Sequence, residues 1–546
     1  MDFPSLTAIA AASAAIGVAS HLGYFIRGEH HVVGPRLVAA AFLIPSAIYI
    51  CILRGIGEDG YLEAAKITAV ATFSYTIALF SSIVIYRLFF HALKKFPGPL
   101  SWRISKLLHT SYLIKNGPRD FIYRDRLHKK YGEFVRVGPN EISITAPEAV
   151  TQILGPKFKK TIWYECIAIP DFALNLERDK ATHDSRRKIW DRAFSTKALR
   201  DYEGRVRQYT DQLISQLNER SGKAVNACEW FNFYAFDIMG DMAFGTPFNM
   251  VKDGKAHSVI TLMTEGMAML GPLTPIIWIL PILKAIPGLA GATKAFIAHN
   301  KKQVEWRKTY TPDSPDLYTY LINASKESPD PIHKDPGWLI GDCGLVIVAG
   351  SDTTTATLSH IFYNLARYPH VQEKLRKELS TFYEPGSEAE FKGLAEATYL
   401  NGIINEALRL HPATPSGLTR LTPPEGVTIG DTYIPGDVTV STPFYTVGRL
   451  ESCFKNASEF IPERWGEKPE LVLNKSVFLP FSTGSAGCVG KQLALMELRN
   501  VTARIISDFD VKFAPGEDGT GIIEKSTDIF TMALEPMMLV FERRVE

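Results

Sequence analysis

The chain has 546 residues, 46% hydrophobic and 22% charged, with 60 basic against 58 acidic side chains. Balanced charge argues against nucleic acid as a partner, and 40 glycines with 33 prolines exclude collagen-like and disordered classes. The six cysteines are scattered and form no C-x-x-C pair, which excludes a disulfide scaffold and the usual cysteine-rich zinc sites.

Three apolar runs open the chain, at residues 7–26, 37–53 and 67–86. Each approaches the ~17–25 residues that a helix needs to cross hydrocarbon, and three such runs do not resemble a cleaved signal peptide. We therefore predict a membrane anchor over residues 1–95. The second run contains Pro45 and could instead be re-entrant, and a buried helical bundle is the alternative for all three.

The segment after the third run indicates orientation and a boundary. Basic residues gather between Arg87 and Lys106, which predicts that the rest of the protein faces the cytosol. Residues 96–99 contain two prolines and predict a stiff hinge. From residue 100 to residue 546 the composition is that of one globular domain.

This globular part shows helical spacing over most of its length and short β-type stretches at 133–137 and 141–145. The predicted fold class is mainly α with small β-sheets (α+β), preceded by transmembrane helices. Residues 271–291 are apolar but hold four prolines, which disfavours a continuous spanning helix. A surface loop that dips into the membrane is one interpretation, and an ordinary core segment is the other.

A glycine-rich loop near the C-terminus surrounds Cys488, with Phe481, Gly484 and Gly490 at fixed spacing and helical sequence after it. A sulfur near a helix N-terminus is favoured as thiolate, and glycines let the backbone approach a flat partner. These features suit an axial ligand to haem iron, with Phe481 shielding the sulfur. A buried structural cysteine is the alternative. A phosphate-binding loop is excluded, because Gln492 replaces the required Ser or Thr.

The loop resembles that of the cytochrome P-450 family of haem-thiolate monooxygenases. Four more segments occur in the family's order: His183–Arg187, Ala349–Thr354, Glu406–Arg409 and Pro462–Trp465. The resemblance covers about residues 95–546 and implies the cytochrome P-450 fold with haem b. Together with the multi-span anchor, the loop is similar to that of fungal members that act on secondary metabolites, the tryprostatin-hydroxylase group among them.

A long helix expected over residues 342–363 carries Gly350, Asp352 and Thr353 in its middle. Glycine and hydroxyl groups within a helix can interrupt the backbone ladder and admit water. The resemblance implies that Asp352 and Thr353 relay protons towards bound dioxygen. A kinked helix with back-bonded threonines is the structural alternative.

The resemblance also implies an ion network of Glu406, Arg409 and Arg464 behind the haem, where it holds the cysteine loop in place. A second Glu-x-x-Arg at Glu373–Arg376 is interpreted as a surface pair, because only the first is followed by His-Pro and by a downstream arginine.

Three residues match family positions that meet the haem propionates: His183, Arg187 and Arg420. Arginine suits a carboxylate through its planar fork, and a surface charge is the alternative for each of them. One departure is visible. The family usually has Arg or His two residues before the cysteine, and here that place is Ala486. One propionate contact is therefore missing or supplied from elsewhere.

The implied function is insertion of one oxygen atom from dioxygen into a C–H bond of a hydrophobic small molecule. No flavin domain fits in the chain, so electrons are expected from a separate NADPH–cytochrome reductase, with cytochrome b5 as a further donor. The expected location is the endoplasmic reticulum membrane. The expected pocket wall comprises residues 164–173, 271–291, 349 and 413–418. A haem-thiolate isomerase or dehydratase and a non-catalytic membrane protein are the alternatives.

Overall fold

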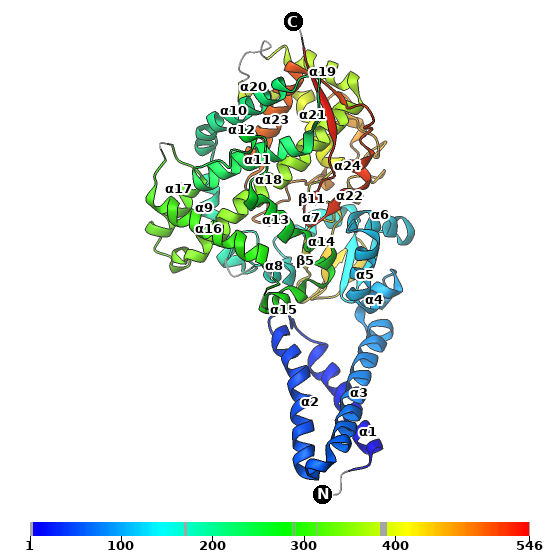
Figure 1. Ribbon diagram of the computed structural model, residues 1–546. Helices are drawn as coiled ribbons and strands as arrows, with labels where there is room; N and C mark the ends of the chain where they lie inside the picture. Colours follow the sequence, from blue (N-terminus) through cyan, green and yellow to red (C-terminus); the bar gives the residue numbers. More distant parts are fainter. Residues whose placement is uncertain are drawn as a thin grey trace. The chain divides into compact units, whose positions relative to one another are not determined.

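The computed structural model describes residues 4–168, 172–286, 288–289, 291–312, 314–382 and 390–544 (Figure 1). Two compact units are present. The anchor unit comprises Met1–Thr110, Arg136–Glu141 and Pro275–Ala290, and the body unit comprises Ser111–Val135, Ile142–Thr274 and Gly291–Glu546. The predicted hinge at residues 96–99 lies inside the anchor unit.

The anchor unit contains three long apolar helices. They are α1 (Leu6–Ser20, continued by a π-helical turn, His21–Phe25), α2 (Gly34–Ile56) and α3 (Tyr61–Ile85, continued by Tyr86–Phe90). All three are long and apolar enough to cross a membrane, and they coincide with the three predicted runs. Pro45 is accommodated inside α2, which runs on without a break.

Helices α1 and α3 pack closely because a glycine lies at their contact. A Cβ atom added at Gly17 would lie 2.5 Å from the carbonyl oxygen of Tyr75. One turn on, the Nδ1 atom of His21 lies 2.8 Å from the hydroxyl of Ser82. Small residues at a contact and polar groups paired across it are typical of helices that associate in lipid.

The proline-rich apolar segment is not one helix. It is divided into α13 (Ser258–Ala268), α14 (Leu270–Leu273), a 3-10 turn (Thr274–Ile279) and α15 (Leu280–Ala285). Its hydropathy and length would permit a fourth span, but the backbone at Ile276 leaves the helical region. The part from Pro275 to Ala290 belongs to the anchor unit, where Ile282 lies 3.5 Å from the Cβ position of Gly34 on α2.

The body unit is mainly helical, as predicted, and is built around α18 (Pro336–Arg367). Most of α18 is buried, and α11 (Ala227–Phe244) runs beside it (Figure 1). The large core cluster is completed by α10 (Thr196–Glu219), α21 (Thr398–Leu410) and α23 (Lys491–Asp508). The other helices are α4 (Leu100–Ile104, in the anchor unit), α5 (Lys106–Asn116), α6 (Asp120–Tyr131), α7 (Pro147–Ile153), α8 (Ile162–Ile167), α9 (Lys180–Ala193), α12 (Met250–Asp253), α16 (Gly291–Thr309), α17 (Leu317–Glu327), α19 (Pro369–Leu379), α20 (Phe391–Glu396), α22 (Phe444–Val447) and α24 (Thr520–Glu524).

The sheets are small. One has the order β1-β2-β8-β5-β3 (Phe134–Gly138, Glu141–Ile144, Thr439–Ser441, Thr419–Leu421, Lys159–Lys160), and another has the order β4-β12-β9 (Ala224–Asn226, Met538–Arg543, Phe509–Phe513). Two hairpins are β6–β7 (Val427–Ile429, Thr432–Ile434) and β10–β11 (Thr527–Asp528, Met532–Ala533). The β3–β5 pairing sets Lys160 opposite Arg420, and the tip of β10–β11 carries Phe530 at a φ of 89°. Both features bear on the site below.

Candidate active site

The loop before α23 holds Cys488 by short backbone hydrogen bonds. The Cys488 N–H donates to the carbonyl of Phe481 (2.8 Å), and the Gly487 N–H donates to the carbonyl of Gly484 (3.0 Å). Gly484 has a φ of 69°, a conformation that glycine adopts without strain. Gly490 caps the N-terminus of α23, so the cysteine lies at a helix start, where the sequence places it.

The Cys488 side chain is exposed, whereas α23 behind it is largely buried. It therefore opens onto a space that protein side chains do not fill. Although solvent can reach the sulfur, the protein atoms packed around the thiol reduce its solvation and raise its pKa, while the amides of Gly490 and Lys491 and the charge of Arg187 lower the pKa less. The helix start favours the thiolate as expected, but it does not outweigh burial. A metal cation bound by the sulfur would lower the pKa of the thiol further and favour the thiolate.

The middle of α18 also contains residues that solvent can reach, and this helix packs against α23. Ala349 is exposed and Gly350, Asp352 and Thr353 are half-buried, in a helix whose other residues are mostly buried. The Thr353 hydroxyl donates to the carbonyl of Ala349 (2.7 Å). The predicted interruption at Gly350 is wrong, because α18 is continuous. The glycine lets α11 pack closely, since a Cβ atom there would lie 2.2 Å from the sulfur of Met239 and would force that side chain to move.

Asp352 has a partner that the sequence does not indicate. The hydroxyl of Thr531, at the tip of the β10–β11 hairpin, donates to its Oδ2 atom at 3.4 Å. Burial raises the pKa of the Asp352 carboxyl to about 7, and the Thr531 hydrogen bond opposes that rise. The two residues are far apart in the chain, so only the folded backbone brings them together.

Glu406 lies between two buried arginines. Its carboxylate accepts from Arg409 at 2.7 and 2.9 Å and from the Nε atom of Arg464 at 2.8 Å, and all three side chains are fully buried. The indole of Trp465 donates to the same carboxylate at 2.9 Å. Trp465 also packs on Phe478, with ring centroids 4.4 Å apart, and this contact links the network to the segment that leads to the cysteine loop.

The three residues expected to meet the haem propionates lie in different surroundings in the structure. Arg187 donates to the carbonyls of Ser485 and Gly487 at 2.8 and 2.6 Å and thereby braces the cysteine loop. Arg420 is buried and donates to the hydroxyl of Tyr164 at 2.8 Å. His183 is buried, with a pKa lowered by burial and by nearby Lys160.

Lys160 is a further cation that sequence reasoning did not single out. It is paired with Arg420 across strands β3 and β5, and its ammonium donates to the carbonyl of Leu174 at 3.3 Å. Burial and the charge of Arg420 lower the pKa of Lys160 to about 7. Among the described residues, neither cation has an ion-pair partner. A half-buried lysine beside a buried arginine suits an anionic ligand.

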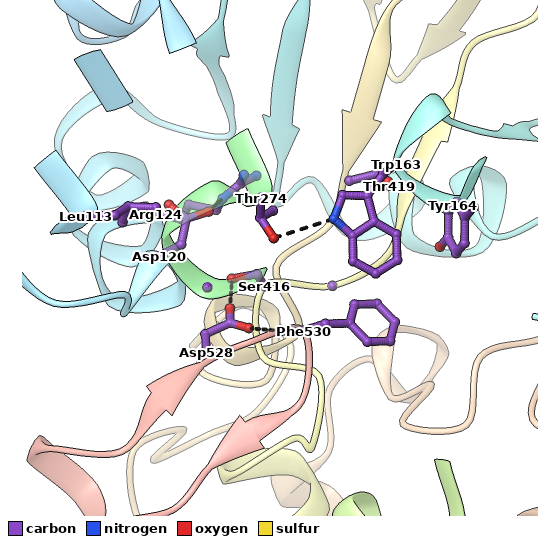
Figure 2. Close-up of a pocket in the computed structure, with 12 residues that line it drawn as sticks. Leu113, Asp120, Arg124, Trp163, Tyr164, Thr274, Ser416, Thr419, Asp528 and Phe530 are labelled. Carbon is purple, nitrogen blue, oxygen red and sulfur yellow. Dashed lines mark hydrogen bonds and ion pairs between the residues drawn. The ribbon is translucent and has the colours of Figure 1, made fainter. Parts of the chain in front are cut away.

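One cavity is defined within the body unit (Figure 2). Tyr164, Gly271, Ser416 and Gly417 line it and belong to three of the four segments predicted as pocket wall, whereas Ala349 does not line it. Residues 169–171, 287 and 290 of the predicted wall lie outside the described residues. Thr274 also lines the cavity and lies in the predicted segment 271–291. The remaining lining residues were not predicted: Leu113, Asp120, Arg124, Trp163, Thr419, Asp528 and Phe530. Trp163 and Thr419 lie directly beside predicted segments, and the others come from distant parts of the chain.

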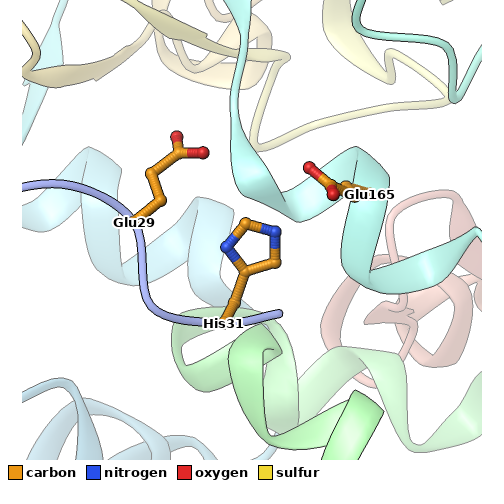
Figure 3. Close-up of side chains that lie close together, drawn as sticks. All are labelled: Glu29, His31 and Glu165. Carbon is orange, nitrogen blue, oxygen red and sulfur yellow. The ribbon is translucent and has the colours of Figure 1, made fainter. Parts of the chain in front are cut away.

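Figure 3 shows Glu29 and His31, which follow α1 in the anchor unit, and Glu165, which lies on α8 in the body unit. Histidine and carboxylate groups are common metal ligands. Within the body unit, however, the carboxylate of Glu165 pairs with Arg178 at 2.5 Å. We assign no metal site to these residues.

Comparison with known proteins decides the family. The cytochrome P450 family model matches residues 97–541. The chain belongs to the cytochrome P450 family. The cytochrome P450 monooxygenase FCK2 of Fusarium pseudograminearum is 40% identical over 97% of this chain and 96% of its own length. Tryprostatin B 6-hydroxylase of Aspergillus fumigatus is 37% identical over 97% and 95% of the two chains.

This P450 is therefore a monooxygenase that uses haem b, dioxygen, a redox partner and a small-molecule substrate. The family binds haem b through a cysteine thiolate, and the haem supplies the iron chemistry that activates dioxygen. The residues of the chain fit that group. Cys488 is exposed at a helix start, and the half-buried Lys160 and the buried Arg420 form a cationic pair suited to carboxylates. The fungal secondary-metabolite resemblance agrees with the hydroxylase named above.

Proposed function

We propose that this P450 hydroxylates a hydrophobic fungal secondary metabolite at a C–H bond, with electrons from the NADPH–cytochrome reductase of the endoplasmic reticulum membrane. Cytochrome b5 is a second possible donor, and the body unit faces the cytosol. The observation that carries the proposal is the Asp352–Thr353 pair at the opening in the middle of α18. An isomerase or dehydratase that does not activate dioxygen would have no use for a proton relay at this position.

In this proposal Cys488 is the haem ligand, and the buried Glu406–Arg409–Arg464 network holds the protein behind it rigid. Asp352 acts as a proton reservoir, because a carboxyl group with a pKa of about 7 both holds and releases a proton near neutral pH. The Thr353 hydroxyl proton is committed to the carbonyl of Ala349, so its oxygen is free to accept a hydrogen bond.

The anchor supports an apolar substrate. Three helices are able to span the membrane, and the apolar segment Pro275–Ala290 groups with them in one compact unit. A molecule that partitions into lipid would be concentrated at such a surface. Basic residues after α3, among them Lys94, Lys95 and Arg103, support the cytosolic orientation.

Membranes that contain the chain and a fungal NADPH–cytochrome reductase can be incubated with a metabolite panel under isotopically labelled dioxygen. We expect one product whose mass rises by a single labelled oxygen atom and which requires NADPH. A product that forms without NADPH, or that takes its oxygen from water, would contradict the proposal.

Thr531→Val is expected to raise the pKa of Asp352, because it removes a hydrogen bond that favours the ionised carboxylate. Asp352 then keeps its proton to higher pH. In a pH profile of product formed per NADPH consumed, the alkaline limb should therefore move up by about 0.5 pH unit. Thr355→Val is the matched control, since this hydroxyl points to α11 at Phe231. An unchanged limb in Thr531→Val would remove Asp352 from proton delivery.

Lys160→Met is expected to speed haem dissociation about 10-fold or more, because a charged hydrogen bond to a propionate contributes roughly 1.5–3 kcal/mol. Transfer of haem to an excess of apomyoglobin measures the rate without any turnover. Lys159→Met is the control, because Lys159 is the exposed neighbour on the same strand. Equal dissociation rates in the two variants would show that Lys160 does not contact the haem.

A further inference from the structure

The cavity in Figure 2 has a carboxylate in its wall and aromatic rings beside it. Asp528, on strand β10, is only 8% exposed. It accepts a hydrogen bond from the hydroxyl of Ser416 and another, at 3.0 Å, from the backbone N–H of Phe530. These two donors are neutral, so they orient the carboxylate but do not balance its charge.

Asp528 has no cation of its own. Among the described residues it forms no ion pair, and burial raises the pKa of its carboxyl to about 6. The guanidinium in the same wall, Arg124, is held by Asp120 at 2.6 Å and donates to Ser441 at 2.8 Å. Asp120, Arg124 and Asp528 in the cavity wall together carry one negative charge in excess when both acids are ionised. Buried carboxylates are normally paired, so this cavity suits a ligand that brings a positive charge.

The aromatic part of the wall favours the same ligand. The rings of Trp163 and Phe530 lie 4.6 Å apart at a tilt of 33°, and Phe530 is two residues after Asp528 in the same hairpin. The Trp163 indole N–H is directed to the hydroxyl of Thr274 at 3.5 Å, and both residues line the cavity. Aromatic faces attract organic cations as well as apolar groups.

The cavity is also linked to the proton reservoir. Thr531, which contacts Asp352, is the residue after Phe530 in the same hairpin tip. A molecule that contacts Phe530 and Asp528 is therefore one residue away from a hydrogen bond to the centre of α18. The tip of the hairpin therefore contacts both the cavity and the centre of α18.

We propose that this cavity binds a cationic amine carried by the substrate, with Asp528 as its counter-ion and Trp163 and Phe530 against its apolar part. The inference rests on the proposed function, because it takes the cavity to be part of the substrate site. It narrows the substrate class to apolar molecules that bear an amine protonated at neutral pH or a quaternary ammonium.

The test compares two probes of the same shape on the haem-loaded, full-length protein. One is tryptamine methylated three times at its amine, a permanent cation that cannot ligate iron. The other is its uncharged isostere, in which carbon replaces the quaternary nitrogen. Dissociation constants are measured by equilibrium dialysis. We expect the wild-type protein to bind the cation about 10-fold or more tightly than the isostere.

Asp528→Asn keeps the size of the side chain and one acceptor for Ser416 while removing the charge. We expect this variant to lose the preference for the cation and to bind the isostere as the wild type does. Ser416→Ala removes the hydrogen bond but leaves the charge, so it should retain the preference to within about 3-fold. If Asp528→Asn does not load haem, the wild-type ratio decides alone.

A wild-type ratio of one or less, or an equal weakening of both probes in Asp528→Asn, would overturn the inference and assign Asp528 a purely structural role. The proposed function fails separately. A protein that forms a labelled product yet shows no preference for the cation loses only the amine site. A protein with the preference but without a thiolate-type carbon monoxide spectrum loses the proposed function.

Discussion

Cys488→Ser is expected to abolish the thiolate-type carbon monoxide spectrum of the reduced protein and to lower product formation by about a thousand-fold or more, equivalent to roughly 4 kcal/mol or more. Serine retains the backbone hydrogen bond from residue 488 to the carbonyl of Phe481, so the loop geometry is preserved. What is lost is the soft, electron-donating sulfur. Spectra and product yields are compared at equal haem content.

Cys51→Ser is the matched control, because Cys51 is the other exposed cysteine and lies on α2 of the anchor unit. It should leave both the spectrum and the product yield unchanged. A Cys488→Ser protein that loads haem and retains the thiolate-type spectrum would show that another cysteine binds the iron. The assignment of the whole loop would then be wrong.

Glu406→Gln is expected to lower the free energy of unfolding by about 3–5 kcal/mol, because it leaves Arg409 and Arg464 buried without their counter-charge. Glutamine has one acceptor oxygen for donors that now bind two, and its amide N–H groups would face guanidinium groups. Denaturant titration of the detergent-solubilised protein, followed by tryptophan fluorescence, measures the loss.

Glu373→Gln provides a control with the same local pattern, since Glu373–Arg376 on α19 is also Glu-x-x-Arg. Glu373 is exposed and Arg376 binds Asp510 instead, so the change should be within about 0.5 kcal/mol. Similar losses in the two variants would contradict a special role for Glu406. A small loss in Glu406→Gln would show that the network is relaxed or hydrated.

Features carried by short stretches of chain could be predicted. The length of an apolar run shows whether a helix could span the membrane, because nearly every residue of such a helix is apolar. The helices α1, α2 and α3 coincide with the three apolar runs. The cysteine loop was recognisable because its turn, its glycine at positive φ and the following helix are consecutive. Glu406 and Arg409 are three residues apart on α21, where a helix sets them side by side.

Helix geometry was predicted less well. The interruption expected at Gly350 does not occur, because the glycine serves the close approach of α11 at Met239. A glycine in the sequence does not by itself show whether the helix is interrupted there or packs closely against a neighbour. The same residue type admits both, and only the neighbouring helix decides between them.

By itself, the sequence indicated three apolar helices long enough to cross a membrane, the mainly helical fold class and the cysteine loop. Only the tertiary structure decided which charges meet. It placed Lys160 opposite Arg420 on neighbouring strands and brought the hydroxyl of Thr531 to the carboxylate of Asp352. It also placed Asp528 near Arg124, an arginine that forms its ion pair with Asp120. Such contacts join residues far apart in the chain, and their energies depend on burial and on neighbouring charge. Burial and charge neighbours follow from packing of the whole domain, and no local pattern encodes them.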